Sequence, residues 1–164
     1  MLTNYCLRDA MSDVDNHLWQ EVAVLIWDTR NLMSKVPRQR QPYFECHTMS
    51  RAIALVLPKL NCVDGFVKGF KPTVEHENGD KTYIFDSCRH SWLLTPDGAI
   101  IDPYPVGFVV AQPILLPKGS IYSPFGHDMY EADSSITTHV AGRTLYRRSI
   151  VLAKFMRQAQ AQAA

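Results

Sequence analysis

The residues best suited to covalent chemistry are a cysteine, a histidine and an aspartate, placed in that order along the chain. Cys46 follows a loop and stands at the expected start of a helix. The N–H groups and dipole of a helix N-terminus stabilise a thiolate, the nucleophilic form of cysteine. Arg38, Arg40 and Arg51 would favour the thiolate further, whereas Glu45 opposes them. We therefore expect a nucleophile whose pKa lies below the ordinary value of about 8.5.

A base for this thiol is available in His90, within the strand-like run 89–94. Asp102 follows across the turn sequence Pro-Asp-Gly at 96–98, in which proline fixes one dihedral angle and glycine accepts a positive φ. In an antiparallel ribbon with its turn there, positions 90 and 102 lie close to opposite one another. The carboxylate could then hold the tautomer and orientation of the imidazole while the other ring nitrogen faces the thiol.

Residues 90–93 read His-Ser-Trp-Leu, and residues 100–103 read Ile-Ile-Asp-Pro beyond the turn. With an upstream cysteine at a helix start, these runs resemble the transglutaminase-like branch of the papain-like cysteine enzymes. That branch typically has a His-Ala-Trp-Val strand and an Asp-Pro-Thr ending; here Ser91 stands in place of the alanine and Tyr104 in place of the threonine. The resemblance spans residues 43–107, where the Gly and Trp that often flank the family's cysteine are absent.

The resemblance implies a papain-like fold and three distinct roles. Cys46 would be the nucleophile, His90 the general base and then acid, and Asp102 the orienting acid. The implied activities are peptidase, amidase, deamidase and transglutaminase, because an acyl-enzyme can be resolved by water or by an amine. The substrate would be a peptide, a protein or a small amide or thioester. The oxyanion donors would be the Cys46 backbone N–H and, by analogy, the Gln41 side chain, which is otherwise a solvated loop residue. No metal or organic cofactor is implied.

Two neighbours of His90 complete the predicted site. We expect Trp92 in the core beneath the site, with substrate contact as the alternative. Cys88 shares a strand face with His90 and would line the same cleft.

Two rival interpretations stay open. Cys46, His47, Cys88 and His90 offer two sulfurs and two nitrogens for zinc, although adjacent ligands are unlike the usual spacing. The other rival is a non-catalytic module that keeps the fold and binds a partner protein through the cleft or the basic C-terminal helix. In that case Cys46 is a buried thiol.

Apolar spacing predicts helices over residues 12–36, 46–57 and 142–160. Ser12 or Asp13 caps the first, and Pro58 ends the second.

Strands are predicted in the middle of the chain, with a tight turn at Asn78-Gly79. Residues 102–119, rich in proline, would form an edge strand or a loop. The predicted strands cover residues 62–70, 81–86, 89–95 and 99–102.

The order of these elements predicts a single α+β domain over residues 1–164, with helices packed on an antiparallel sheet. Within it we expect a basic linker over 36–45 and a frayed tail over 158–164.

Composition excludes several classes of protein. The 164 residues are 46% hydrophobic and 20% charged, as in an ordinary globular domain, and the net charge of +1 makes nucleic acid an unlikely ligand. No apolar run reaches the roughly 20 residues of a membrane span, and Arg8 and Asp9 interrupt any signal-like stretch. We therefore expect a cytoplasmic protein with free thiols and no membrane partner.

The predicted C-terminal helix carries several basic residues and no acidic one. We expect them to form a solvated face, and the alternative is a site for an anionic partner. The residues are Arg143, Arg147, Arg148, Lys154 and Arg157.

Overall fold

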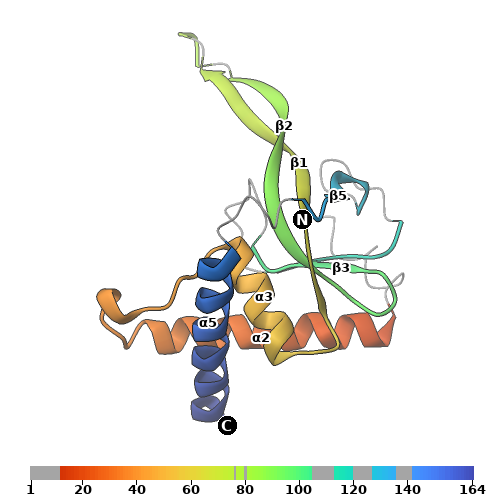
Figure 1. Cartoon of the computed structure of the whole chain (residues 1–164). Coiled ribbons are helices and arrows are strands. Elements are labelled where there is room, and N and C mark those ends of the chain that lie inside the picture. Colours follow the sequence, from red (N-terminus) through yellow and green to blue (C-terminus); the bar gives the residue numbers. More distant parts are fainter. Residues whose placement is uncertain (1–11, 76, 80, 105–112, 120–126, 136–141) are drawn as a thin grey trace.

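A computed structural model describes residues 12–75, 77–79, 81–104, 113–119, 127–135 and 142–164. These residues form an α+β fold in which three helices pack on a five-stranded antiparallel sheet of order β4-β3-β2-β1-β5 (Figure 1). The helices are α2 (Asp13–Met33), α3 (Cys46–Val56) and α5 (Gly142–Ala163), and short 3₁₀ turns cover η1 (Arg38–Arg40) and η2 (His127–Met129). The strands are β1 (Asn61–Glu75), β2 (Lys81–Leu94), β3 (Ile100–Asp102), β4 (Ile114–Leu116) and β5 (Tyr130–Ala132).

The first two helices begin and end close to where the sequence predicts. Ser12 caps α2 by accepting a hydrogen bond from the Asp15 N–H at 3.1 Å. Glu45 caps α3, which ends just before Pro58. The linker between them has no regular structure apart from η1, which agrees with its two prolines, Pro37 and Pro42.

Helix α5 differs from the prediction at its C-terminal end. It continues through Ala163, where we expected a frayed tail. Alanine and glutamine are good helix formers, which explains the extension. The five basic residues of this helix are exposed, but two of them make contacts. Arg148 lies 3.7 Å from the centre of the Tyr43 ring, and Arg157 donates to the Leu55 carbonyl. The basic face is therefore only partly a solvated surface.

The sheet is built around the long hairpin of β1 and β2. The predicted strands 81–86 and 89–95 are one continuous strand, paired with β1 from Asn61 to Glu75. The outer part of this ribbon extends away from the helices (Figure 1). Strand β4 is the edge strand expected within 102–119, whereas residues 105–112 lie outside the described part of the chain. Strand β5 was not predicted.

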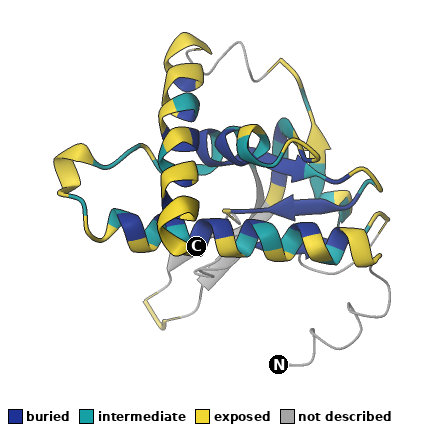
Figure 2. Cartoon of the chain, turned by 90° about the horizontal axis from the view of Figure 1, so that it is seen from below, coloured by how far each residue is buried: buried dark blue, intermediate teal, exposed yellow. Residues whose placement is uncertain are grey.

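The two faces of the sheet have different roles. Leu93, Ile101 and Leu115 belong to the main core, which the buried sides of α2, α3 and α5 complete (Figure 2). A smaller cluster on the opposite face includes Trp92 and Ile100. His90 and Asp102 share the strand parity of Trp92 and Ile100, so they belong to the face turned away from the main core.

Candidate functional site

The expected histidine–aspartate pair forms on adjacent antiparallel strands. Leu93 pairs with Ile101 across β2 and β3, and this register places Asp102 diagonally across from His90. The His90 Nε2 and Asp102 Oδ2 atoms are 2.8 Å apart, and both side chains are completely buried. The hairpin turn at 96–98 therefore brings His90 and Asp102 together as the sequence predicts, although the two residues are diagonal rather than directly opposite.

Among the described residues, Asp102 accepts hydrogen bonds from His90 Nε2, from the Tyr130 hydroxyl at 2.6 Å and from the Tyr104 backbone N–H at 3.0 Å. A carboxylate can only accept hydrogen bonds, so His90 carries its proton on Nε2. The other ring nitrogen, Nδ1, is buried and has no hydrogen-bond partner among the described residues. This tautomer leaves the Nδ1 lone pair able to take up a proton.

Tyr130 is the site residue that the sequence analysis missed. It lies on the short strand β5, and its hydroxyl bonds to the same Asp102 oxygen as His90. Burial raises its pKa, and the Asp102 charge raises it further, so the hydroxyl stays a donor. The ring packs edge-on against Trp92, with centroids 5.1 Å apart. No motif or spacing marks Tyr130, because it follows Asp102 by 28 residues on a strand without a strong pattern.

Helix α3 reaches the site where strand β3 ends. The Asp64 carbonyl accepts from the Asp133 N–H on the β5 side, so its cross-strand neighbour Ser91 directs its own N–H and C=O toward the β3 side. Strand β3 is too short to meet them. Instead Ser50 Oγ donates to the Ser91 carbonyl at 3.0 Å, and the Ser91 N–H lies beside the Cys46 sulfur. The first turn of α3 therefore places Cys46 next to the residue that follows His90.

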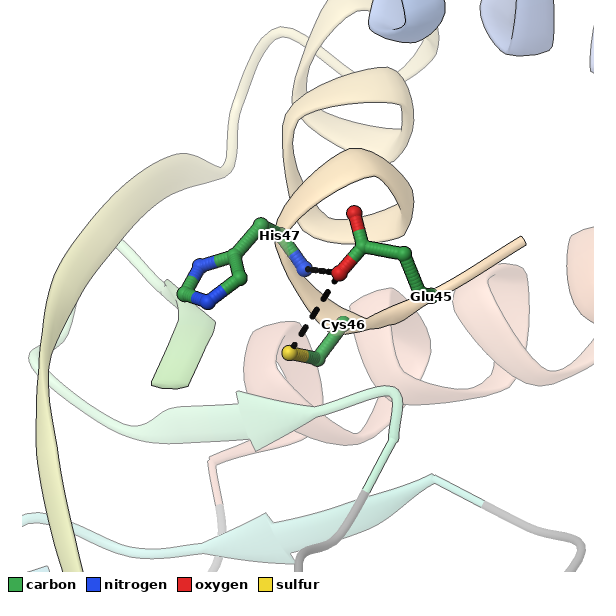
Figure 3. Close-up of side chains that lie close together, drawn as sticks. All are labelled: Glu45, Cys46 and His47. Atoms are coloured by element: carbon green, nitrogen blue, oxygen red, sulfur yellow. Dashed lines mark hydrogen bonds between the residues drawn. The ribbon is translucent and has the colours of Figure 1, made fainter. Parts of the chain in front are cut away.

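The Cys46 thiol sits in an environment that favours its protonated form. Burial raises its pKa to about 12; the Glu45 and Asp102 carboxylates add to the rise, and the Ser91 N–H opposes it. The expectation of a lowered pKa is therefore wrong. Burial is the main cause, and Glu45 adds to it. Its carboxylate accepts the His47 N–H (Figure 3) and the Thr48 N–H, which would otherwise be available to stabilise a thiolate.

The thiol and the imidazole are not joined by a hydrogen bond. Cys46 Sγ donates to Glu45 Oε2 at 3.7 Å, and His90 Nδ1 is without a partner in the described part of the chain. In this structure the Cys46 thiol therefore contacts Glu45 and the Ser91 N–H rather than His90.

His47 takes part in a separate polar network on the helix side of the sheet. Its Nδ1 lies 2.6 Å from Ser91 Oγ, which in turn donates to Asp64. Arg51 forms an ion pair with Asp64 and also donates to Ser91 Oγ. Since the single Ser91 proton goes to Asp64, His47 donates through Nδ1 and keeps its lone pair on Nε2. Burial lowers the pKa of His47, which agrees with a neutral ring.

The possible zinc ligands that lie together in the structure are not the set expected from the sequence. Glu45, Cys46 and His47 each present a possible ligand atom, and these atoms lie within 4.8 Å of one another (Figure 3). Cys88 and His90 do not belong to this group. The Glu45 carboxylate already accepts two backbone N–H groups and the Thr48 hydroxyl, so a metal ion would have to displace its capping bonds.

The remaining predicted residues have different outcomes. Gln41 donates its amide hydrogens to the carbonyls of Met33 and Val36 at 2.9 and 3.0 Å, so it fastens the linker to the end of α2 and has no donor left for an oxyanion. Trp92 is only 2% exposed and packs beneath His90, as expected. Cys88 is a half-buried free thiol on β2.

No protein-family model matches this chain, and neither the curated proteins nor the solved structures contain a significant match to it. Among the described residues, none of the helices has the length and apolar character needed to cross a membrane.

Proposed function

We propose that this chain is a cysteine-dependent hydrolase or acyltransferase that acts on an amide or thioester bond through an acyl-enzyme on Cys46. The observation that carries the proposal is the buried His90–Asp102 pair, 2.8 Å apart, whose second imidazole nitrogen has no partner in the described structure. A buried polar atom left unpaired is costly, so its retention calls for an explanation. The Cys46 sulfur lies beside the N–H of Ser91, the residue that follows His90, so Cys46 is the group proposed to give its proton to this nitrogen.

The proposed reaction begins with a protonated thiol. Cys46 turns from Glu45 toward His90, and its proton passes to Nδ1 as the sulfur attacks the substrate carbonyl carbon. A bond forms between sulfur and carbon, and His90 gives the proton to the leaving amine or thiol as the original bond breaks. Water or an amine then attacks the acyl-enzyme, its proton passes to Nδ1, and the sulfur recovers a proton as it leaves. Asp102 keeps the Nε2 proton throughout and stabilises the transient imidazolium.

The oxyanion donor in this proposal is the backbone N–H of Cys46. It lies at the first position of α3, and the Glu45 carboxylate bonds to the next two N–H groups rather than to this one. Such a donor, fixed by the helix, can stabilise negative charge that develops on the substrate oxygen. Gln41 has no part in it.

The substrate class proposed is a peptide, a protein or a small amide or thioester, with water or an amine as the acceptor. The arrangement of Cys46, His90 and Asp102 supports a transglutaminase-like, papain-like assignment within the α+β fold. The chemistry needs no metal or organic cofactor. It does need a free thiol, which suits a reducing compartment such as the cytoplasm.

A second candidate function is a catalytically silent module of the same fold that binds a partner protein. The bond from Cys46 to Glu45 and the raised thiol pKa are the observations that favour it. In that case His90 and Asp102 form a structural pair.

A thioester substrate separates the two candidates. With S-phenyl thioacetate, we expect a burst of thiophenol equal to the enzyme concentration, followed by slower turnover. His90→Ala should slow acylation by about 10²–10⁴-fold, the usual contribution of a general base. Cys46→Ser should abolish the burst, and Cys88→Ser, a matched change of a half-buried thiol, should retain it. A burst that survives Cys46→Ser, or no difference between wild type and His90→Ala, would favour the silent module.

A further inference from the structure

The Tyr130 hydroxyl lies as close to the Asp102 carboxylate as the His90 imidazole does. It donates to Oδ2 at 2.6 Å, while His90 Nε2 contacts the same oxygen at 2.8 Å. The other carboxylate oxygen, Oδ1, accepts from the Tyr104 backbone N–H at 3.0 Å. Both carboxylate oxygens of Asp102 therefore have a donor besides the histidine, and among the described residues Tyr130 is the side chain that supplies one.

The strands are adapted to bring Tyr130 to this position. Strand β5 runs beside β1, with Tyr130 opposite Val67 and Ala132 opposite Gly65. On its other side Gly65 pairs with His90. A Cβ atom at Gly65 would lie 2.0 Å from the Glu131 carbonyl oxygen and 2.5 Å from Cη2 of Trp92. Glycine at this point therefore permits the close approach of β5 and the passage of the Trp92 ring across β1.

Trp92 packs against the Tyr130 ring and helps to fix its position. Its ring meets Tyr130 at 5.1 Å with an interplanar angle of 77°, and it stacks on His90 at 6.4 Å. Edge-to-face aromatic contacts of this kind fix ring orientation as well as burying apolar area. The rings of His90, Trp92 and Tyr130 thus pack against one another, and two of them, His90 and Tyr130, contact the Asp102 carboxylate.

We propose that Tyr130 is a positioning residue of the site: its hydroxyl fixes the rotation of the Asp102 carboxylate and thereby the alignment of the His90 imidazole. The role in turnover rests on the proposed function, whereas the effect on the imidazole does not. With Tyr130 in place, rotation of the carboxylate would break a charge-assisted hydrogen bond in a buried environment. Without it, Oδ2 is held by His90 alone, and both side chains gain freedom.

The test is Tyr130→Phe, which keeps the ring and removes the hydroxyl. The matched control is Tyr104→Phe, because the Tyr104 side chain is 45% exposed and only its backbone N–H contacts Asp102. The first measurement is the proton resonance of His90 Nε2–H in ¹⁵N-labelled protein. With one donor removed, Asp102 accepts more strongly from His90, so we expect this resonance to move downfield in Tyr130→Phe and to stay in place in Tyr104→Phe.

The second measurement is turnover of S-phenyl thioacetate. We expect kcat to fall about tenfold in Tyr130→Phe with KM unchanged, as for the loss of one hydrogen bond to a charged group. Equal resonances and equal kcat values in the two variants would overturn the proposal. A shifted resonance in a protein without turnover would support the positioning contact while contradicting the proposed function.

A second substitution keeps the test usable if Tyr130→Phe fails to fold. Placing 3-fluorotyrosine at position 130 retains the ring and makes the hydroxyl a stronger donor. Asp102 then accepts less strongly from His90, and the Nε2–H resonance should move upfield. An unmoved resonance would count against the proposal.

Discussion

Cys46 differs from the usual reactive cysteine in the group that caps its helix. A helix N-terminus normally lowers a thiol pKa, because its N–H groups face the sulfur. Here the Glu45 carboxylate occupies the N–H groups of His47 and Thr48 and accepts the thiol proton as well. With this arrangement the resting thiol is neutral, so in the proposed reaction His90 must remove the proton during the attack rather than before it.

The first prediction concerns the pH dependence of this thiol. Since burial, Glu45 and Asp102 raise the pKa of Cys46 to about 12, the thiolate fraction should grow about tenfold per pH unit between pH 7 and 10. Alkylation by iodoacetamide should follow this slope without a plateau, and Cys46 should not be labelled preferentially at mildly acidic pH. Peptide mass spectrometry after timed labelling measures both. A plateau below pH 8 would contradict the neutral resting thiol.

Glu45→Gln tests the cause of the raised pKa. Glutamine keeps an oxygen for the cap but removes the negative charge beside the sulfur, so the pKa of Cys46 should fall and its alkylation at pH 8 should become faster. Cys62 serves as an internal control, because burial raises its pKa to about 12 without a Glu45 contribution. Faster labelling of both thiols would indicate a general opening of the fold rather than a local charge effect.

A third prediction separates the two histidines near Cys46. His90 is backed by Asp102, whereas His47 contacts Ser91 and belongs to the network on the helix side. We expect His47→Ala to retain acylation of Cys46 within about tenfold, and His90→Ala to lose it to the extent expected of a missing general base. Single-turnover kinetics with S-phenyl thioacetate measure both variants. The opposite ranking would make His47 the base.

Two strands position the residues of the site: β3, which is short, and β5, which lies close against β1. Strand β3 ends at Asp102, and this leaves the edge of β2 open to the first turn of α3. Strand β5 lies against β1 only because position 65 is a glycine. The first arrangement brings Cys46 to the site and the second brings Tyr130, so the hairpin of β1 and β2 supports both residues.

Gly65→Ala therefore has a large expected effect. The added carbon would meet the backbone of β5 and the Trp92 ring, and the strands must separate to accommodate it. We expect a loss of stability of about 3 kcal/mol, the upper part of the range for an overpacked site, measured by chemical unfolding. Gly142→Ala is the matched control, because nothing lies within 4 Å of its added carbon. Equal stability of the two variants would show that β5 is not packed as described.

In the molecule as a whole, the sequence predicted local features better than it predicted tertiary contacts. The helices α2 and α3 follow from apolar spacing and end signals, and the His90–Asp102 pair follows from one hairpin turn. Tyr130 could not be found this way, because β5 pairs with β1 across more than sixty residues of chain.

The protonation state of the Cys46 thiol also could not be predicted from the sequence. Arg51, expected to lower its pKa, is instead paired with Asp64, while the Glu45 carboxylate folds back onto the helix. Gln41 similarly turns toward α2. Such loop side chains turn toward the unpaired backbone N–H and C=O groups at neighbouring helix ends. The spacing of residues along the chain does not show which of these groups a side chain will reach.

The charge of the molecule gives a prediction of its own. The chain carries a net charge of +1, and Arg148 and Arg157 of the basic helix α5 contact Tyr43 and the Leu55 carbonyl. We expect no binding of duplex DNA or RNA at micromolar protein in about 150 mM salt, measured by fluorescence anisotropy. Tight binding that weakens steeply with added salt would instead identify α5 as a phosphate-binding surface.

In the proposed function, acyl transfer passes through Cys46 with His90 as its base. The most direct measurement is to quench a single turnover of S-phenyl thioacetate in acid and to locate the acetyl group by peptide mass spectrometry. We expect a hydroxylamine-sensitive acetyl thioester on the Cys46 peptide of the wild type, formed far more slowly in His90→Ala. An acetyl group found on Cys62, Cys88 or a lysine, with Cys46 unmodified, would contradict it.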